Sequence, residues 1–129
     1  MSAILLVACE EKPKETDVLY NKVMEVHDEI MPKMGDIMKL KKQLKEKLAE
    51  LDTATEIDRA KIDDIERAIA DLDNSHEEMM GWMRQFDRDF EGMVNEEILK
   101  YLNDQKGRIE KVGQVTNAAL QNAQEQLAE

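Results

Sequence analysis

The chain has 129 residues, which is the size of one domain. Glycine, proline and aromatic residues are scarce while 36% of residues are charged, which excludes an aromatic-rich β core and indicates long helices. The net charge of −11 argues against nucleic acid as a partner, and the single cysteine excludes an internal disulfide and any multi-cysteine metal motif.

The beginning of the chain has the form of a bacterial lipoprotein leader. Residues 3–8 are apolar, and Leu6-Val7-Ala8-Cys9 matches a lipobox, in which the cysteine becomes acylated. The apolar run is short and no Lys or Arg precedes it, so we expect residues 1–9 to be a truncated signal. Residues 10–16 are polar and predict a flexible tether. The alternative is an incidental cysteine in a frayed N-terminus.

A first helix is predicted over residues 17–51, capped by Thr16 or Asp17. Its expected inward residues are Val23, Ile30, Ile37, Leu44 and Leu51, with Leu19, Val26, Met34, Leu40 and Leu48 between them. Pro32 lies inside this helix and removes one backbone hydrogen bond. Because the apolar pattern resumes in phase, we expect a kink near residues 28–31 and not a break.

A second helix is predicted over residues 54–90, since Thr53 and Glu56 form a capping box and Gly92 can end it. Its expected inward residues are Ile62, Ile65, Ile69, Leu72, His76, Met79, Met83, Phe86 and Phe90. A third helix is predicted over residues 95–127, capped by Asn95. Its inward positions are Ile98, Leu102, Gln105, Ile109, Val112, Thr116, Ala119 and Ala123.

Three helices of similar length joined by short turns predict an all-α, antiparallel up-down-up three-helix bundle about 50 Å long. We expect a monomer; a helical hairpin that completes its core by dimerising is the alternative. Lysines of the first helix lie level with acidic residues of the second, and the predicted pairs are Lys42 with Asp63 and Lys39 with Glu66. The alternative for these lysines is a phosphate-binding patch.

Most methionines and both histidines fall in two short windows, one on each of the first two helices. The windows comprise Met24, His27, Met31, Met34 and Met38, and His76, Met79, Met80, Trp82 and Met83. Antiparallel pairing about Asp52 predicts that His27 faces residue 77 or 78, so both windows lie at one level of the bundle.

One interpretation of these windows is a soft core. Methionine fills irregular space around a proline kink, and a histidine in a helix seam is usually hydrogen-bonded to a neighbour such as Asp28, Asp73 or Glu77. Trp82 would then lie over the edge of the core with its N–H in water. A partner-binding groove on the methionine-rich side is a further alternative, and it predicts an exposed apolar patch.

The other interpretation is a metal site, because thioether sulfur and imidazole favour Cu(I) or Ag(I). The Met-x-x-His and His-x-x-Met spacings resemble repeats of periplasmic silver- and copper-binding proteins. The candidate ligands are His27, Met31, His76, Met79 and Met83, with Met24, Met34, Met80 and Trp82 as secondary ligands or shields.

Other chemistries do not fit the sequence. A di-iron site needs Glu-x-x-His on two helices, and only Asp73-x-x-His76 comes close. The chain has no Cys-x-x-Cys-His for haem, no glycine-rich phosphate loop, and no nucleophile at a fixed spacing from either histidine. We therefore expect a protein that is not an enzyme.

Residues 26–35 (VHDEIMPKMG) and 73–83 (DNSHEEMMGWM) resemble a group of small bacterial lipoproteins of unknown function that often carry the label "viral A-type inclusion protein". The resemblance covers most of the mature chain. It implies a lipid-anchored protein of the cell envelope, acylated at Cys9, and it supplies no activity.

Overall fold

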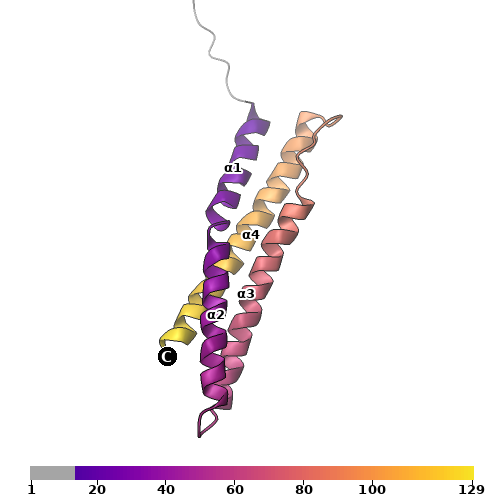
Figure 1. Ribbon diagram of the computed structural model, residues 1–129. Coiled ribbons are helices and arrows are strands. Elements are labelled where there is room, and N and C mark those ends of the chain that lie inside the picture. The colour runs from indigo at the N-terminus through magenta and orange to yellow at the C-terminus, as the bar shows by residue number, and fades with distance from the viewer. Residues whose placement is uncertain (1–13) are drawn as a thin grey trace, which may run out of the picture.

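The computed structural model describes residues 14–129, so the expected leader, Cys9 and residues 10–13 of the expected tether lie outside the described residues. The described chain is all-α, with α1 (Glu15–Ile30), α2 (Lys33–Asp52), α3 (Arg59–Gln85) and α4 (Asn95–Ala128). The segments α1 and α2 form one long helix bent at residues 31–32, which packs with α3 and α4 into a three-helix bundle (Figure 1). The predicted fold class is confirmed.

The bend between α1 and α2 keeps the helical register. Met31 has φ −54° and ψ −43°, and its N–H donates to the His27 carbonyl over 3.0 Å, as in a continuous helix. Pro32 has φ −60° and ψ −27° but has no N–H to donate. Val23 and Ile30 before the bend, and Ile37 and Leu44 after it, are all buried. The predicted kink is therefore confirmed.

The bend changes which helices lie next to each other. The α2 segment packs closely against both α3 and α4. The α1 segment packs closely against α4 only, and along their described lengths no Cα of α1 comes within 8 Å of a Cα of α3. Where α1 meets α4, a Cβ on Gly113 would lie 3.3 Å from Cδ1 of Ile30, so the two backbones approach closely there. The space between α1 and α3 is wider and requires long side chains to fill it.

Two of the three predicted helix starts are wrong in detail. The first helix begins at Glu15, and its N-cap Lys14 makes no side-chain cap bond, so neither Thr16 nor Asp17 caps it. The second begins at Arg59, capped by Asp58, whose Oδ1 accepts from the Lys61 N–H over 3.1 Å. The Thr53 hydroxyl instead donates to the Glu50 carbonyl at the end of α2, because residues 53–58 form a longer turn than a capping box allows.

The other turn also begins earlier than predicted. The α3 helix ends at Gln85, and residues 86–94 form a non-helical connection to α4 in which Gly92 has a φ of +79°. Gly92 therefore shapes this turn and does not end the helix. The α4 helix begins at Asn95 as predicted, but its N-cap is Val94 and the Asn95 side chain does not cap it.

The buried face of α3 consists of two rows of residues along the helix, and one of these rows differs from the predicted inward residues. Ile65, Leu72 and Met79 are buried as expected. The second row consists of Ala68, Ser75 and Trp82, whereas the predicted Ile69 and His76 are half-buried and Met83 is exposed. Both rows satisfy a three-four spacing, and the small residues Ala68 and Ser75 suit the close packing on α4. Gln105 and Thr116 of α4 point inward as predicted.

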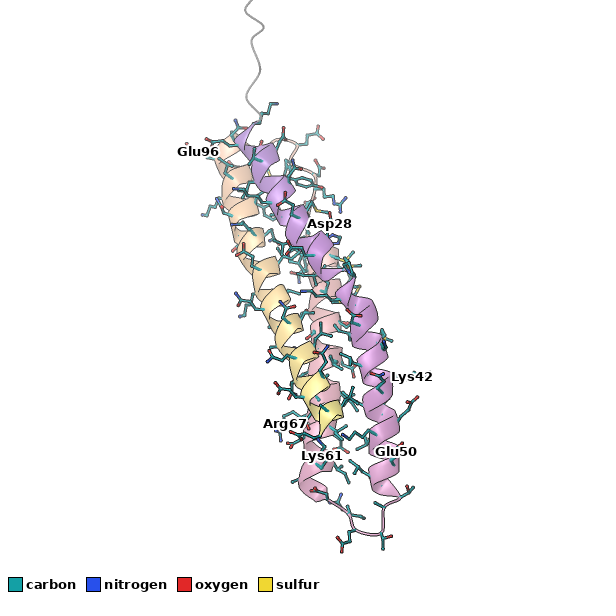
Figure 2. All side chains as sticks on the ribbon, turned by 90° about the vertical axis from the view of Figure 1, so that its left-hand side faces the viewer. Asp28, Lys42, Glu50, Lys61, Arg67 and Glu96 are labelled. Carbon is teal, nitrogen blue, oxygen red and sulfur yellow. The ribbon has the colours of Figure 1, made fainter. Side chains whose placement is uncertain are left out.

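Lysines connect the helices, but not in the predicted pairs. Lys41 pairs with Asp73 of α3. Among the described residues, no ion pair joins Lys42 to Asp63 or Lys39 to Glu66; Lys42 is exposed on α2 (Figure 2). Since the turn before α3 is longer than predicted, the two helices are offset from the expected pairing.

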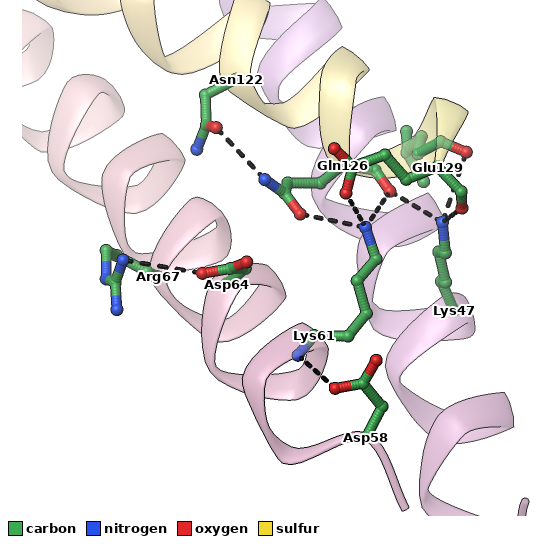
Figure 3. A network of polar contacts seen from close by, with 9 residues as sticks. Lys47, Asp58, Lys61, Asp64, Arg67, Asn122, Gln126 and Glu129 are labelled. Atoms are coloured by element: carbon green, nitrogen blue, oxygen red, sulfur yellow. Dashed lines mark hydrogen bonds and ion pairs between the residues drawn. The ribbon is translucent and has the colours of Figure 1, made fainter.

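A second polar contact fastens the end of α4. Lys47 of α2 donates to the Gln126 carbonyl over 2.7 Å, and Lys61 of α3 donates to the same carbonyl over 3.1 Å (Figure 3). Lys61 also pairs with Glu129 at 2.7 Å. Two cations therefore satisfy carbonyls that the last turn of a helix leaves free, and their charge suits its negative end.

Candidate functional site

All five aromatic residues of the chain contact one another toward one end of the bundle. Figure 1 shows that α1 begins, α3 ends and α4 begins at this end. The five residues are Tyr20, Trp82, Phe86, Phe90 and Tyr101. We call this set the aromatic cluster. The aromatic cluster and His27 lie in the wide space between α1 and α3. Tyr101 joins the cluster from α4.

Phe86 is the centre of the aromatic cluster. Its ring stacks on Trp82 with centroids 4.7 Å apart, and on Tyr20 and Tyr101 at 6.1 Å each. Phe90 meets Tyr101 edge to face at 6.1 Å. The Tyr101 hydroxyl accepts the Asp87 N–H over 2.7 Å, which fixes the chain just beyond the end of α3. The cluster thus joins three helices where the backbones of α1 and α3 are apart.

Trp82 is placed differently from the sequence expectation. Its side chain is only 6% exposed, and its Nε1 is buried without a hydrogen-bond partner among the described residues. The prediction that this N–H would lie in water is therefore wrong. The reason is the one-row shift on α3, which turns Trp82 inward in place of Met83.

His27 lies against Trp82. The centroids of the two rings are 6.1 Å apart, and the rings are tilted by 39°. The His27 side chain is 15% exposed, and its Nδ1 lies 3.0 Å from Oδ1 of Asp28. When Nδ1–H donates to this carboxylate, Nε2 carries the free lone pair of the ring. The neighbour Asp28 was one of the partners that the sequence suggested.

The contact between His27 and Trp82 brings the two methionine-rich windows together. Tyr20 of α1 stacks on Phe86 of α3. Because the two helices are antiparallel, moving seven residues along each from this pair places His27 opposite Met79. The observed ring contact of His27 is with Trp82, three residues from Met79. His27 therefore lies level with residues 79–82, within about one turn of the predicted 77 or 78. The windows share a level of the bundle.

The methionines of the windows have different surroundings. Met34 and Met79 are core residues, and Met31 and Met80 are partly buried against the core. Met24 is half-buried on α1, whereas Met38 and Met83 are exposed. The two windows thus lie partly in the core and partly on the surface, and the five candidate ligands are not all buried.

The register of α1 and α3 does not place His76 opposite His27. Asp73, three residues before it, pairs with Lys41, so His76 is on the flank of α3 that faces the first helix. It is six residues from Trp82, or about 9 Å along the helix axis. Side chains lean toward the N-terminus of their own helix, and these helices are antiparallel, so the two imidazoles lean apart. The register favours His27 with Trp82, and not the two histidines, as the pair that one ligand contacts.

A hollow on the described surface lies beside the bend and does not include His27 or Trp82 in its lining. It has a volume of about 370 Å³, lies between α1 and α4, and is lined by Ile30, Lys33, Gly113 and Asn117 among others. Within residues 14–129, no three His, Cys, Asp or Glu side chains are arranged to hold a metal ion. None of the helices in this range combines the length and the apolar character needed to cross a membrane.

Sequence reasoning identified His27 and Trp82 but missed the residues that position them. Phe86 stacks on the Trp82 ring and Tyr20 stacks on Phe86, and neither belongs to a methionine-rich window. A usable signal is that the chain has only five aromatic residues and that three of them, Tyr20, Phe86 and Phe90, fall within four residues of a predicted helix start or end. No protein-family model matches the chain, and comparison with curated proteins and with solved structures finds no similar protein.

Proposed function

We propose that this chain is a non-enzymatic, lipid-anchored protein of the bacterial cell envelope, in which the bundle is a binding or structural module held at the membrane. The lipobox form of residues 6–9 and the resemblance of residues 26–35 and 73–83 to small lipoproteins support the anchor. The observation that supports a bundle held close to the membrane is the start of α1 at Glu15. Only residues 10–14 separate this helix from Cys9, and five residues span at most about 18 Å.

This short separation gives the module an orientation. An acylated Cys9 would keep the beginning of α1, and with it the aromatic cluster, close to the lipid. The turn at residues 53–58 lies at the other end of the bundle (Figure 1). The 27 residues of α3 put about 40 Å between its two ends. The net charge of −11 repels anionic headgroups, which favours an upright bundle over one that lies on the membrane.

The anchor is tested by labelling cells that express the full-length gene product with a palmitate analogue. We expect label on the wild-type protein, which fractionates with membranes, and neither property in a Cys9→Ala variant. A wild-type protein that takes up no label and fractionates as a soluble protein would refute the anchor. The bundle contains no other cysteine that could be acylated instead.

The orientation is tested with two exposed positions at opposite ends. Val94 precedes α4 at the aromatic end and is 59% exposed, and Ile57 precedes α3 at the other end and is 56% exposed. In acylated protein on vesicles, a fluorophore on V94C should be quenched by headgroup-attached quenchers, and one on I57C should not. The similar exposure of the two side chains makes the positions matched controls. Equal quenching at both would mean that the bundle lies flat.

A role in binding a protein partner is compatible with this arrangement. The exposed large apolar residues of the described chain are Val18, Met38, Ile57, Met83 and Val94. Two of them belong to the methionine-rich windows, and two lie in the turns. The partner groove on the methionine-rich side therefore stays a prediction, as does the monomeric state, which sedimentation of the acyl-free protein would test.

A further inference from the structure

We propose that His27 and the thioethers beside it on α1 bind a soft monovalent cation, Cu(I) or Ag(I), against the ring of Trp82. This site is independent of the lipid anchor, since every residue in it lies within the described bundle. It also differs from the site that the sequence suggested, because His76 is not a ligand.

The first argument is the hydrogen bond of His27. Metal-binding histidines commonly donate one ring N–H to a carboxylate, which orients the ring and makes the other nitrogen a better ligand. Here Nδ1 of His27 lies 3.0 Å from Oδ1 of Asp28, so Nε2 is the nitrogen left for a ligand. The Asp28 side chain is 74% exposed and has no role in the core that would otherwise explain the pair.

The second argument is the pair of thioethers on the same face of α1. Met24 precedes His27 by three residues and Met31 follows it by four, spacings that place side chains next to each other on a helix. Met31 is still in helical register at the bend, because its N–H donates to the His27 carbonyl. Both methionines are half-buried and flexible. One imidazole with thioethers is a ligand set that favours Cu(I) and Ag(I) over Zn²⁺, Ca²⁺ or Mg²⁺.

The third argument is the ring of Trp82. A cation within about 6 Å of an indole centroid is attracted to the ring face, and the His27 and Trp82 centroids are 6.1 Å apart. Phe86 stacks on Trp82 with centroids 4.7 Å apart and holds it in place. The α1 backbone stays away from the α3 backbone, so side chains occupy the space between the two helices. A cation bound at Nε2 of His27 would lie beside a buried aromatic face that excludes water.

The test is competition for Cu(I) between the protein and a chromophoric chelator under reducing conditions, with Trp82 emission as a second readout. The full chain carries Cys9→Ser, since a free thiolate would itself bind Cu(I). We expect one equivalent of Cu(I), or of Ag(I), to bind and to quench Trp82. His27→Ala, and Met24→Leu with Met31→Leu, should each weaken binding. Asp28→Asn should weaken it about 10–100-fold, as expected for loss of the ligand's hydrogen-bond partner.

His76→Ala is the matched control, because it removes the other histidine from the facing window and should leave binding unchanged. Asp28→Asn alters an exposed side chain, so it remains informative if His27→Ala perturbs folding, which far-UV circular dichroism would reveal. The proposal is overturned if His27→Ala or Asp28→Asn binds as tightly as the parent. It is equally overturned if His76→Ala weakens binding as much, or if the parent binds more weakly than about micromolar.

Discussion

Thr116 offers a direct test of the polar positions in the core. Its side chain is 0% exposed, and its hydroxyl has no hydrogen-bond partner among the described residues. A buried hydroxyl without a partner costs about 1–3 kcal/mol. Thr116→Val replaces the hydroxyl by a methyl group of similar shape, and the helix propensities of the two residues are nearly equal. We therefore expect the free energy of unfolding to rise by about 1–2 kcal/mol.

The assay is urea denaturation followed by far-UV circular dichroism, in which the midpoint should rise without a change in the m-value. In thermal unfolding the same gain corresponds to about 3–6 °C for a domain of this size. The converse control is Val112→Thr. Val112 is one turn earlier on the same face of α4 and is also buried, so a hydroxyl introduced there should cost a similar amount.

A loss of stability in Thr116→Val would refute this reasoning. It would mean that the hydroxyl donates to the carbonyl four residues earlier, as Ser75 does to the Asp71 carbonyl over 2.9 Å. Ser75 of α3 and Thr116 of α4 are equally buried. The Ser75 hydroxyl has a hydrogen-bond partner and the Thr116 hydroxyl has none among the described residues, so the two residues can be compared directly.

Two further predictions concern α4. Gly107→Ala should raise the free energy of unfolding by about 0.5–1 kcal/mol, because a Cβ there meets nothing within 4 Å and alanine favours a helix. Gly113→Ala should gain less, since its Cβ would lie 3.3 Å from Cδ1 of Ile30; an equal gain in urea denaturation would mean that Ile30 moves aside. The hydrogen bond from Lys61 lowers the pKa of Glu129 below its ordinary value of 4.5. The pair therefore stabilises the fold above this value and loses its effect as the pH falls through the lowered pKa. In Lys61→Met, stability should fall less steeply on acidification, and an unchanged pH profile would contradict the pairing.

The predicted bend of the first helix, and the predicted inward faces of the first and third helices, agree with the structure. Each rests on an apolar pattern that runs along the whole helix. Apolar residues repeat every seven positions on both sides of Pro32, at Val23, Ile30, Ile37 and Leu44. All four can be buried on one face only if the kink at the proline keeps the helical register. The inward position of Thr116 in α4 followed from the same spacing.

The helix ends were less predictable because several capping residues compete. Thr53 and Asp58 are both good caps, and the one that forms the bond depends on how far the chain must travel to reach the next helix. That distance is a property of the assembled bundle. The same limit applies to the ion pairs, since a longer turn offsets the facing helices and leaves Lys42 exposed.

The all-α class, the three long helices and the bend at the proline could be predicted from the sequence, because each follows from spacing along a single helix. The shared level of the two methionine-rich windows could also be predicted, because antiparallel pairing of the first two helices requires it. Only the tertiary structure decided which row of α3 is buried and therefore that Trp82 lies inside, against His27. The two rows have the same spacing. The choice between them depends on how closely α4 approaches and how far the bend carries α1 from α3, and neither quantity is encoded in the periodicity of one helix.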